Sequence, residues 1–316
     1  MKHLLAISAT VSFAMLGLPS MPASAHDTSA DDGTHAGNLF RLASLPAPLV
    51  SFTESGKWRV IRSNAIPAHQ TGQFPNRANP NAISAQDIEV RVPVAPTWQG
   101  RATEARRPGI ALNGVMFEPG TAECFGKARG GNAGRQGARP QRGQRPPPRQ
   151  RGGQQGGRQS GRAQSGGGPQ DCDWREEAII GGRGRLGLDA SNAHVQPTGQ
   201  YHYHGIPDGL VARLAPGHDG LVHVGWAADG YRMVLDPAGR LTPSYRLRTG
   251  KRGSGPGGSF DGTYTADYEF AEGLGDLDSC NGTAVNGEYI YVLTETFPYV
   301  PRCLNGRPDS SFSRRR

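Results

Sequence analysis

The chain has 316 residues and a formal net charge of +8. Ten of its 35 Lys and Arg residues lie within residues 127–170, where there is no Asp or Glu. The other 25 stand against 27 acidic residues, so the remainder of the chain is close to neutral. This distribution excludes a folded domain that is basic as a whole and assigns the positive charge to one segment.

The N-terminal segment, residues 1–25, has the composition of an export signal. Lys2 and His3 precede an apolar run over residues 4–18, and Ala23-Ser24-Ala25 closes the segment. The pattern predicts cleavage before His26 and a periplasmic or secreted mature protein, with an uncleaved anchor as the alternative. The apolar run is short for a bilayer span and no similar run follows it, so we expect no transmembrane segment in the mature chain.

Residues 26–48 are polar and predict a flexible lead-in. From residue 57 onward, short runs rich in Val, Ile, Tyr and Trp are separated by Gly, Pro, Asn and Asp. Their two-residue alternation indicates strands, and Asp229-Gly230 between two apolar runs predicts a hairpin. We therefore expect one mainly β domain over residues 49–305, either β-sandwich-like or a distorted barrel with long loops, and a basic tail over residues 306–316.

The Arg- and Gly-rich segment, residues 127–170, interrupts this domain. It contains almost nothing that a core could bury, so we expect it to be disordered. Such segments bind single-stranded RNA by charge and stacking, but export removes that partner and makes nucleic acid an unfavoured ligand. The interpretations that stay open are a solvated loop insertion and a contact with anionic envelope polymer or lipid headgroups.

Four cysteines in an exported chain predict two disulfides, for which three pairings are open. Order along the chain favours Cys124 with Cys172, because these two flank the insertion. It also favours Cys280 with Cys303, because they bracket a C-terminal hairpin. The sequence has no Cys-x-x-Cys, which argues against a redox motif or a zinc ribbon.

The most informative motif is Tyr201-His202-Tyr203-His204. Side chains alternate between faces along a strand, so the two histidines should project to one side and the two tyrosines to the other. A second copy lies near the C-terminus. Residues 188–203 and 277–291 both read Leu-Asp-x-(Ser/Cys)-Asn-(Ala/Gly), then a turn, then Gly-x-Tyr-x-Tyr. Ile290 and Val292 replace the histidines there, which predicts a purely structural strand.

Five separated segments, in this order, resemble the bacterial YHYH-domain family. They are Asn-Ala-Ile-Pro-Ala-His at 64–69, residues 74–81, residues 111–123, the Tyr-His-Tyr-His segment itself, and Gly-Trp-Ala-Ala-Asp-Gly-Tyr at 225–231. The resemblance spans about residues 58–305 apart from the insertion. The family has no settled biochemical activity, so the resemblance implies a domain and a motif but no reaction.

A third histidine, His194, lies across a turn from His202 and His204. Histidines two apart on a strand have Cβ atoms about 6.5 to 7 Å apart, which lets both imidazoles converge on one ion. The spacing His-x(7)-His-x-His therefore suits a three-nitrogen site for zinc, copper or iron. A polar strand face without metal is the alternative. Outer candidates for the site are His69, His218 and Asp229, although Asp229 also suits a turn.

Oxygen-based sites have less support in the sequence. Asp276 and Asp278 begin a segment with some features of a calcium loop, but its twelfth position is Gly287, where a bidentate Glu is needed. A transition metal is therefore favoured over calcium. A glycosidase with paired carboxylates also stays open, although caps and turns explain each of its candidates. Those candidates are Glu118, Glu123, Asp189 and Asp229.

Three functions follow from these patterns. The first is an extracytoplasmic β domain that binds a transition metal. The second is a periplasmic enzyme, oxidative or carbohydrate-directed, that uses the same pocket. The third is a non-catalytic envelope- or surface-binding module in which the Tyr-His-Tyr-His strand is only architecture.

Overall fold

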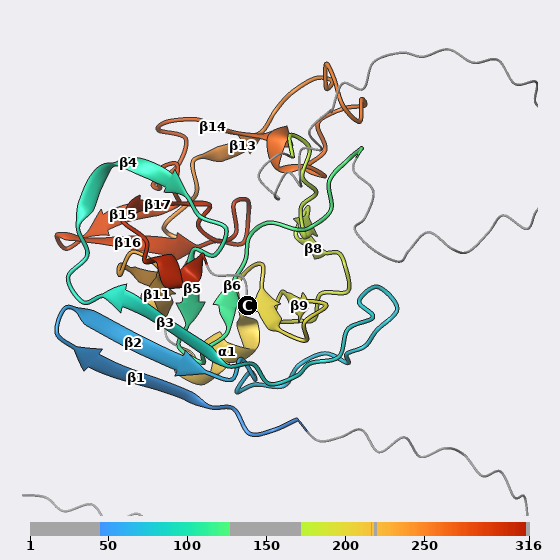
Figure 1. Ribbon diagram of the computed structural model, residues 1–316. Coiled ribbons are helices and arrows are strands. Elements are labelled where there is room, and N and C mark those ends of the chain that lie inside the picture. Colours follow the sequence, from blue (N-terminus) through green and yellow to red (C-terminus); the bar gives the residue numbers. More distant parts are fainter. Residues whose placement is uncertain (1–44, 127–171, 216, 218–219, 314–316) are drawn as a thin grey trace, which may run out of the picture. The chain divides into compact units, whose positions relative to one another are not determined.

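The computed structural model describes residues 45–126, 172–215, 217 and 220–313 (Figure 1). The predicted signal peptide, most of the lead-in, the insertion, His218 and the last three residues of the tail lie outside these ranges. The described residues form seventeen strands, one helix, α1 (Asp208–Leu214), and two 3-10 turns, so the prediction of a mainly β domain is confirmed. None of the described helices has the length and apolar character needed to cross a membrane.

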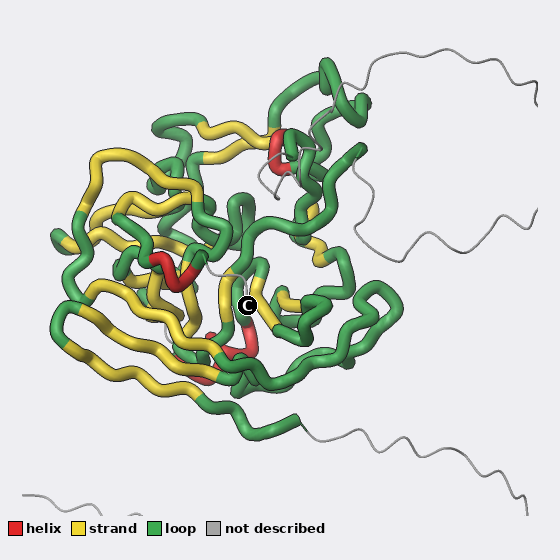
Figure 2. Tube along the Cα trace, viewed as in Figure 1, coloured by secondary structure: helices red, strands yellow, loops and turns green. Residues whose placement is uncertain are grey.

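The largest sheet has eight strands in the order β15-β16-β12-β11-β5-β6-β10-β9. Tight turns join the strands of its hairpins, and longer loops connect one hairpin to the next, as the yellow and green segments of Figure 2 show. Four of the strands come from the first half of the domain: β5 (Gly109–Ala111), β6 (Met116–Phe117), β9 (Ala193–Val195) and β10 (Tyr201–Tyr203). Four come from the second half: β11 (Val222–Ala227), β12 (Arg232–Leu235), β15 (Gly282–Val285) and β16 (Glu288–Leu293).

The two halves of this sheet repeat one arrangement. In the first half β5 pairs antiparallel with β6, β6 pairs parallel with β10, and β10 pairs antiparallel with β9. In the second half β11, β12, β16 and β15 pair in the same order and with the same directions. The halves meet where β5 and β11 pair antiparallel. The strand order is therefore palindromic, which means that it repeats in reverse on either side of the β5–β11 pair. An approximate twofold rotation about an axis through the sheet relates the two halves.

The first hairpins of the two halves turn at equivalent dipeptides, Asn113-Gly114 and Asp229-Gly230. Each glycine has a positive φ, +81° and +96°, which few residues with a side chain adopt. Each glycine N–H donates to a carbonyl three residues back, at 2.8 Å in the first half and 2.9 Å in the second. The hairpin predicted at Asp229-Gly230 is confirmed, and the sequence has its counterpart at Asn113-Gly114.

Smaller sheets complete the described fold. A three-stranded sheet comprises β1 (Val50–Ser55), β2 (Trp58–Ser63) and β3 (Ile88–Pro93). Three two-stranded sheets pair β4 (Trp98–Glu104) with β17 (Cys303–Gly306), β13 (Tyr245–Leu247) with β14 (Tyr268–Phe270), and β7 (Ile179–Ile180) with β8 (Arg183–Gly184). The 3-10 turns are η1 (Thr265–Asp267) and η2 (Ser310–Phe312). Phe312 of η2 is buried in the main core, so the folded chain continues past residue 305 to this residue.

Three of the four tyrosines of the two sequence copies lie in the main hydrophobic core, and the fourth, Tyr289, packs against it. Tyr201, Tyr203 and Tyr291 are each fully buried there. The opposite face of β16 packs into a separate apolar cluster with neighbouring strands and turns. That cluster consists of Val234, Leu277, Ile290 and Val292. The alternation expected along the second copy therefore places aromatic side chains in one core and aliphatic side chains in another.

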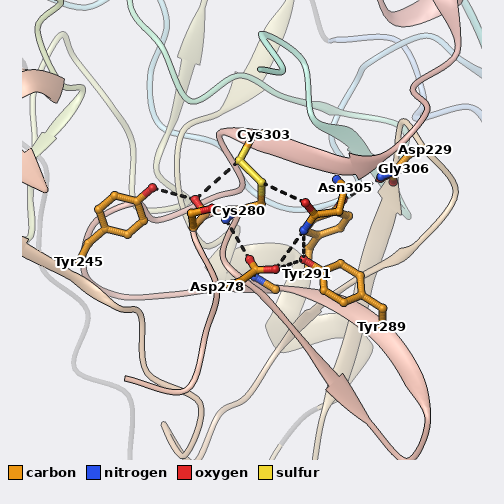
Figure 3. Close-up of a disulfide and its surroundings, with 11 residues drawn as sticks. Asp229, Tyr245, Asp278, Cys280, Tyr289, Tyr291, Cys303, Asn305 and Gly306 are labelled. Carbon is orange, nitrogen blue, oxygen red and sulfur yellow. Dashed lines mark hydrogen bonds between the residues drawn. A yellow bond between two sulfur atoms is a disulfide. The ribbon is translucent and has the colours of Figure 1, made fainter. Parts of the chain in front are cut away.

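Two disulfides join Cys124 to Cys172 and Cys280 to Cys303. The first closes the ends of the segment that contains the insertion. Figure 3 shows the second, which links the turn before β15 to β17 beside the hydrogen-bonded side chains of Asp278 and Asn305. No cysteine is free. The second sequence copy is thus fixed covalently to the strand that follows it in the fold.

Candidate metal centre

The hairpin of β9 and β10 brings the three histidines of the first sequence copy to one face of the sheet. His202 pairs directly with His194 across the two strands. His204 continues the same face one residue beyond β10, where its N–H donates to the carbonyl of Asn192 at 2.8 Å. Strand alternation and hairpin register together account for this arrangement, which the spacing in the sequence predicted.

The three imidazoles face one another. Their ring centroids are 4.7 to 4.8 Å apart in all three pairs. His194 Nε2 and His204 Nε2 approach to 3.1 Å, and one nitrogen from each ring lies within 4.8 Å of the others. His202 and His204 are only 3% and 2% exposed, and His194 is half-buried. The described residues contain this one group of three or more His, Cys, Asp or Glu side chains arranged to hold an ion.

Backbone carbonyls orient two of the rings. His194 Nδ1 lies 3.0 Å from the carbonyl oxygen of Leu186, and His202 Nδ1 lies 3.4 Å from that of Gln200. Both Nδ1 atoms are therefore assigned as donors, which leaves Nε2 of each neutral ring unprotonated, with a lone pair that can accept a hydrogen bond or bind a metal. Fixing a histidine through its second nitrogen is the usual way in which proteins prepare an imidazole ligand.

The third ring, His204, has an unsatisfied buried nitrogen. With His194 Nε2 as acceptor, His204 must donate from Nε2, and its Nδ1 is then a buried acceptor without a partner. Burial lowers the pKa of this ring, and the carbonyl of Pro119 opposes that shift, as a carbonyl does by favouring a proton on the ring. If a cation took the Nε2 lone pair, the proton would move to Nδ1 and could be donated to Pro119. The orphaned atom thus fits a group with a positive charge at the centre of the three rings.

All three imidazoles are held in the neutral form. Burial lowers the pKa of His202 to about 4, and the nearby Glu118 carboxylate opposes this shift. Burial, followed by the charges of His202 and His194, holds the pKa of His204 well below its ordinary value. Burial also lowers the pKa of His194, against the carbonyl of Leu186. Neutral imidazole is the form that binds metals, so these rings are ready to bind across the neutral range.

A buried carboxylate, Glu118, lies beside the three histidines. It follows β6, where its N–H donates to the carbonyl of Tyr203, and its side chain is on the same face of the sheet as His202 and His204. Arg107 Nε donates to Glu118 Oε1 and Gln196 Nε2 donates to Oε2, both at 2.7 Å. The carboxylate is therefore fully paired and contributes negative charge next to the rings.

His69 lies on the other face of β10. Its Nε2 is 2.6 Å from the hydroxyl of Tyr203, which also accepts a hydrogen bond from Asn113 Nδ2 at 2.8 Å. A tyrosine hydroxyl has one hydrogen to donate. Because this hydroxyl accepts from Asn113, we assign its own hydrogen to the bond with His69 Nε2. The structure therefore separates His69, a predicted outer candidate, from the three-histidine group by the thickness of the sheet.

Asp229 belongs to the second half of the sheet. Its Oδ2 accepts hydrogen bonds from the Tyr291 hydroxyl at 2.7 Å and from the Gly306 N–H at 2.9 Å, while its Oδ1 is buried without a partner. Burial raises the pKa of this carboxyl group. Asp229 is the counterpart of Asn113 and does not join the histidines, so its predicted turn role agrees with its position better than its predicted outer-ligand role.

The profile of the family described as YHYH protein matches residues 89–306. The chain belongs to the YHYH protein family. No curated protein and no solved structure matches the chain. The match includes both halves of the eight-stranded sheet, so the YHYH domain comprises the two repeated halves and not the histidine hairpin alone.

Each half of the YHYH domain is stabilised by an aspartate at the equivalent position. Asp189 Oδ1 accepts hydrogen bonds from the N–H groups two and four residues later, and its Oδ2 accepts from the Tyr201 hydroxyl at 2.6 Å. Asp278 repeats these contacts, with the Tyr289 hydroxyl at 2.7 Å. These bonds give both aspartates a structural role. Asp189 was a candidate for a glycosidase and Asp278 for a calcium site. Thr242 likewise occupies the Asp276 carboxylate.

This repeated contact predicts equal effects of two substitutions. Tyr201→Phe and Tyr289→Phe should each lower the free energy of unfolding by about 1.5 to 3 kcal/mol, because each removes a hydrogen bond to a half-buried carboxylate. Urea unfolding at neutral pH measures both values. A large loss for one variant and none for the other would show that the two halves do not depend on the same contact.

The second half of the YHYH domain shows which residues stand at the positions equivalent to the histidines. Counting from the shared aspartates, His194 corresponds to Thr283. Aligning the shared Gly-x-Tyr-x-Tyr makes His202 correspond to Ile290 and His204 to Val292, and the strand pairings agree. The strand pairings also place Glu118 opposite His204 where Val234 stands opposite Val292. Sequence reasoning found the three histidines but did not find Arg107 and Gln196, because nothing in their local sequence marks them as partners of Glu118.

Proposed function

We propose that this YHYH protein is an extracytoplasmic domain that binds one transition-metal ion through Nε2 of His194, His202 and His204. The observation that carries the proposal is the convergence of three neutral imidazoles, two buried and one half-buried, two of them oriented through Nδ1 by backbone carbonyls. A merely structural histidine cluster would not need a nitrogen of each ring within 4.8 Å of the other two, and the unsatisfied Nδ1 of His204 is explained by a cation.

The distances support a small ion. Three nitrogens at 2.0 to 2.1 Å from a tetrahedral ion are about 3.3 Å from one another. The Nε2 atoms of His194 and His204 are already 3.1 Å apart. The widest separation within the group, up to 4.8 Å, requires a modest movement of one ring. Imidazole nitrogens suit zinc, copper or iron, whereas calcium prefers oxygen ligands.

Three protein ligands leave a coordination position for water or another small ligand. When bound, an ion of this kind supplies a Lewis acid and can lower the pKa of a coordinated water. The chain's own contribution is to orient the rings through Leu186 and Gln200, to exclude water from His202 and His204, and to place the Glu118 carboxylate beside them. The negative charge of Glu118 stabilises added positive charge in a site of low exposure.

The extracytoplasmic location rests on two independent features. The N-terminal residues have the pattern of an export signal, and both disulfides would be reduced in an ordinary cytosol. An exported protein is exposed to anionic envelope polymer and lipid headgroups. We therefore include in the proposal a contact between these anionic groups and the basic insertion.

Metal content tests the proposal directly. The mature chain, purified without an affinity His tag, should contain about one equivalent of zinc, copper or iron by elemental analysis, and the double variant His202→Ala/His204→Ala should retain almost none. His223→Ala is the matched control, because His223 is half-buried on β11 and bonds through Nε2 to the Gly225 carbonyl, away from the three-histidine group. Equal, substoichiometric metal in the wild type and the double variant would end the proposal.

A further inference from the structure

A groove lined by aromatic rings lies next to the end of the histidine hairpin. It consists of two adjoining hollows of about 280 and 470 Å³ that share Gly182, Glu295 and Tyr299. The smaller hollow includes Gly205, the residue that follows His204, and Asp208 at the start of α1. The larger hollow extends to β13 and β14. Together they have the size of a groove for a ligand of several rings.

The floor of the larger hollow is a stacked pair of rings. Tyr268 and Phe297 lie parallel, with centroids 3.9 Å apart and an interplanar angle of 2°. The guanidinium of Arg302 lies over the Phe297 ring at 4.7 Å, and Glu177, which is 2% exposed, binds it through two hydrogen bonds of 2.7 and 2.9 Å. An ion pair with a buried carboxylate thus fixes Phe297, and Phe297 in turn supports the half-buried ring of Tyr268.

Tyr299 adds a strained residue to the same groove. Its φ of +64° lies in the left-handed region, which costs a bulky residue about 1 to 2 kcal/mol. Such a conformation persists only where the surroundings impose it, and it is common at binding sites. Here it places a ring that borders both hollows and packs edge-on against Phe297.

The charged groups of the groove limit the class of ligand. Asp208 and Glu295 line the smaller hollow, and both residues are exposed. At the other end, Arg246 is paired with Glu269 at 2.8 Å. The lining therefore offers hydrogen-bond acceptors and disfavours an anion. A cation is a weaker fit, because Phe297 and Tyr268 are stacked on each other and do not form a cage of rings around one point, and exposed carboxylates contribute little binding energy.

A neutral sugar chain satisfies both features of the groove. The C–H bonds of a sugar ring pack on the electron-rich face of an aromatic ring, and sugar hydroxyls donate to carboxylates. We propose that this groove binds a neutral carbohydrate chain, with one sugar ring stacked on Tyr268 and hydroxyls of a neighbouring sugar donating to Asp208 and Glu295. The proposal goes beyond metal binding and does not depend on it.

Calorimetric titration of the full mature chain with cellotetraose, chitotetraose, xylotetraose and maltotetraose tests the proposal, with and without chelator. At least one tetrasaccharide should bind, with an affinity that is insensitive to salt. Tyr268→Ala should weaken that binding by about tenfold or more, Tyr268→Phe should preserve it, and Glu295→Gln should weaken it less than Tyr268→Ala does. Trp98→Ala, which removes a 51% exposed ring on β4, is the matched control and should bind as the wild type does.

Three results would overturn the proposal. One is binding of none of the four tetrasaccharides by the folded wild-type protein. Another is binding that Trp98→Ala weakens as much as Tyr268→Ala does. The third is preferential binding of choline or spermidine that salt and Glu295→Gln abolish, which would identify the groove as a site for organic cations. Loss of metal in His202→Ala/His204→Ala with unchanged tetrasaccharide binding would leave the carbohydrate proposal intact and separate it from the metal proposal.

Discussion

Replacing Ile290 with alanine is expected to lower the free energy of unfolding by about 2 to 5 kcal/mol, because the side chain is fully buried and the change leaves a cavity. The cavity would lie in the apolar cluster formed with Val234, Leu277 and Val292. His202 occupies the equivalent position in the first half of the sheet, yet His202→Ala should cost the metal-free protein much less. The wild-type ring makes one long hydrogen bond, to the carbonyl of Gln200, and its ring neighbours are the polar imidazoles of His194 and His204.

Thermal unfolding of both variants, with and without chelator, separates the two roles. For His202→Ala we expect most of the loss to be visible only without chelator, where the wild type is stabilised by its bound ion. For Ile290→Ala the loss should be the same in both conditions. If His202→Ala destabilises the chelated protein as much as Ile290→Ala does, His202 is a core residue and the assignment of the metal centre is wrong.

Much of the site could be predicted from the sequence because its determinants are local. Alternation along Tyr201 to His204 separates tyrosines from histidines, and a hairpin of the observed length brings His194 opposite His202. The repeated Leu-Asp pattern also indicated that two segments share one local structure. The contacts of Asp189 and Asp278 give the physical reason, since each aspartate caps its own turn and binds a tyrosine one strand later.

The remainder depends on contacts between distant segments, which local patterns do not encode. Nothing around Arg107 or Gln196 predicts that they would pair with Glu118. His69 was an equally good outer ligand in the sequence, but its segment packs on the tyrosine side of β10. The palindromic sheet also could not be predicted from the hairpins alone, because the antiparallel pairing of β5 with β11 joins residues more than a hundred positions apart.

The duplicated fold bears on the function of the histidine face. In the second half the same face is filled by Val234, Ile290 and Val292, which stabilise the sheet without polar groups. The first half replaces this apolar packing with three histidines and a paired carboxylate, and a buried polar group costs free energy unless it is satisfied. Because the equivalent face of the second half is packed with apolar side chains alone, the polar side chains of the first half are best explained by a ligand that they bind.

That comparison leads to a prediction for acid stability. In the metal-free protein the free energy of unfolding should fall as the pH is lowered from 6.5 toward 4. The unfolded chain takes up a proton at His202 near its ordinary pKa of 6.5, whereas the folded chain does so only near the lowered pKa of about 4. Protonation in this window therefore favours unfolding, and His202 alone should account for a loss of about 3 kcal/mol. His194 and His204, whose pKa values are also lowered, should add to the loss.

The triple variant His194→Thr/His202→Ile/His204→Val, which copies the second half, isolates this effect. It should bind no metal, and its stability should change much less between pH 6.5 and 4, because the three imidazoles with lowered pKa values are absent. Ionised carboxylates such as Asp261, whose pKa is lowered to about 2, lose their contribution mainly below this window. Chemical unfolding of both chelated proteins across the pH range decides the matter. If the triple variant shows the same fall as the wild type, the sensitivity arises elsewhere and the three histidines are not the buried neutral cluster that metal binding requires.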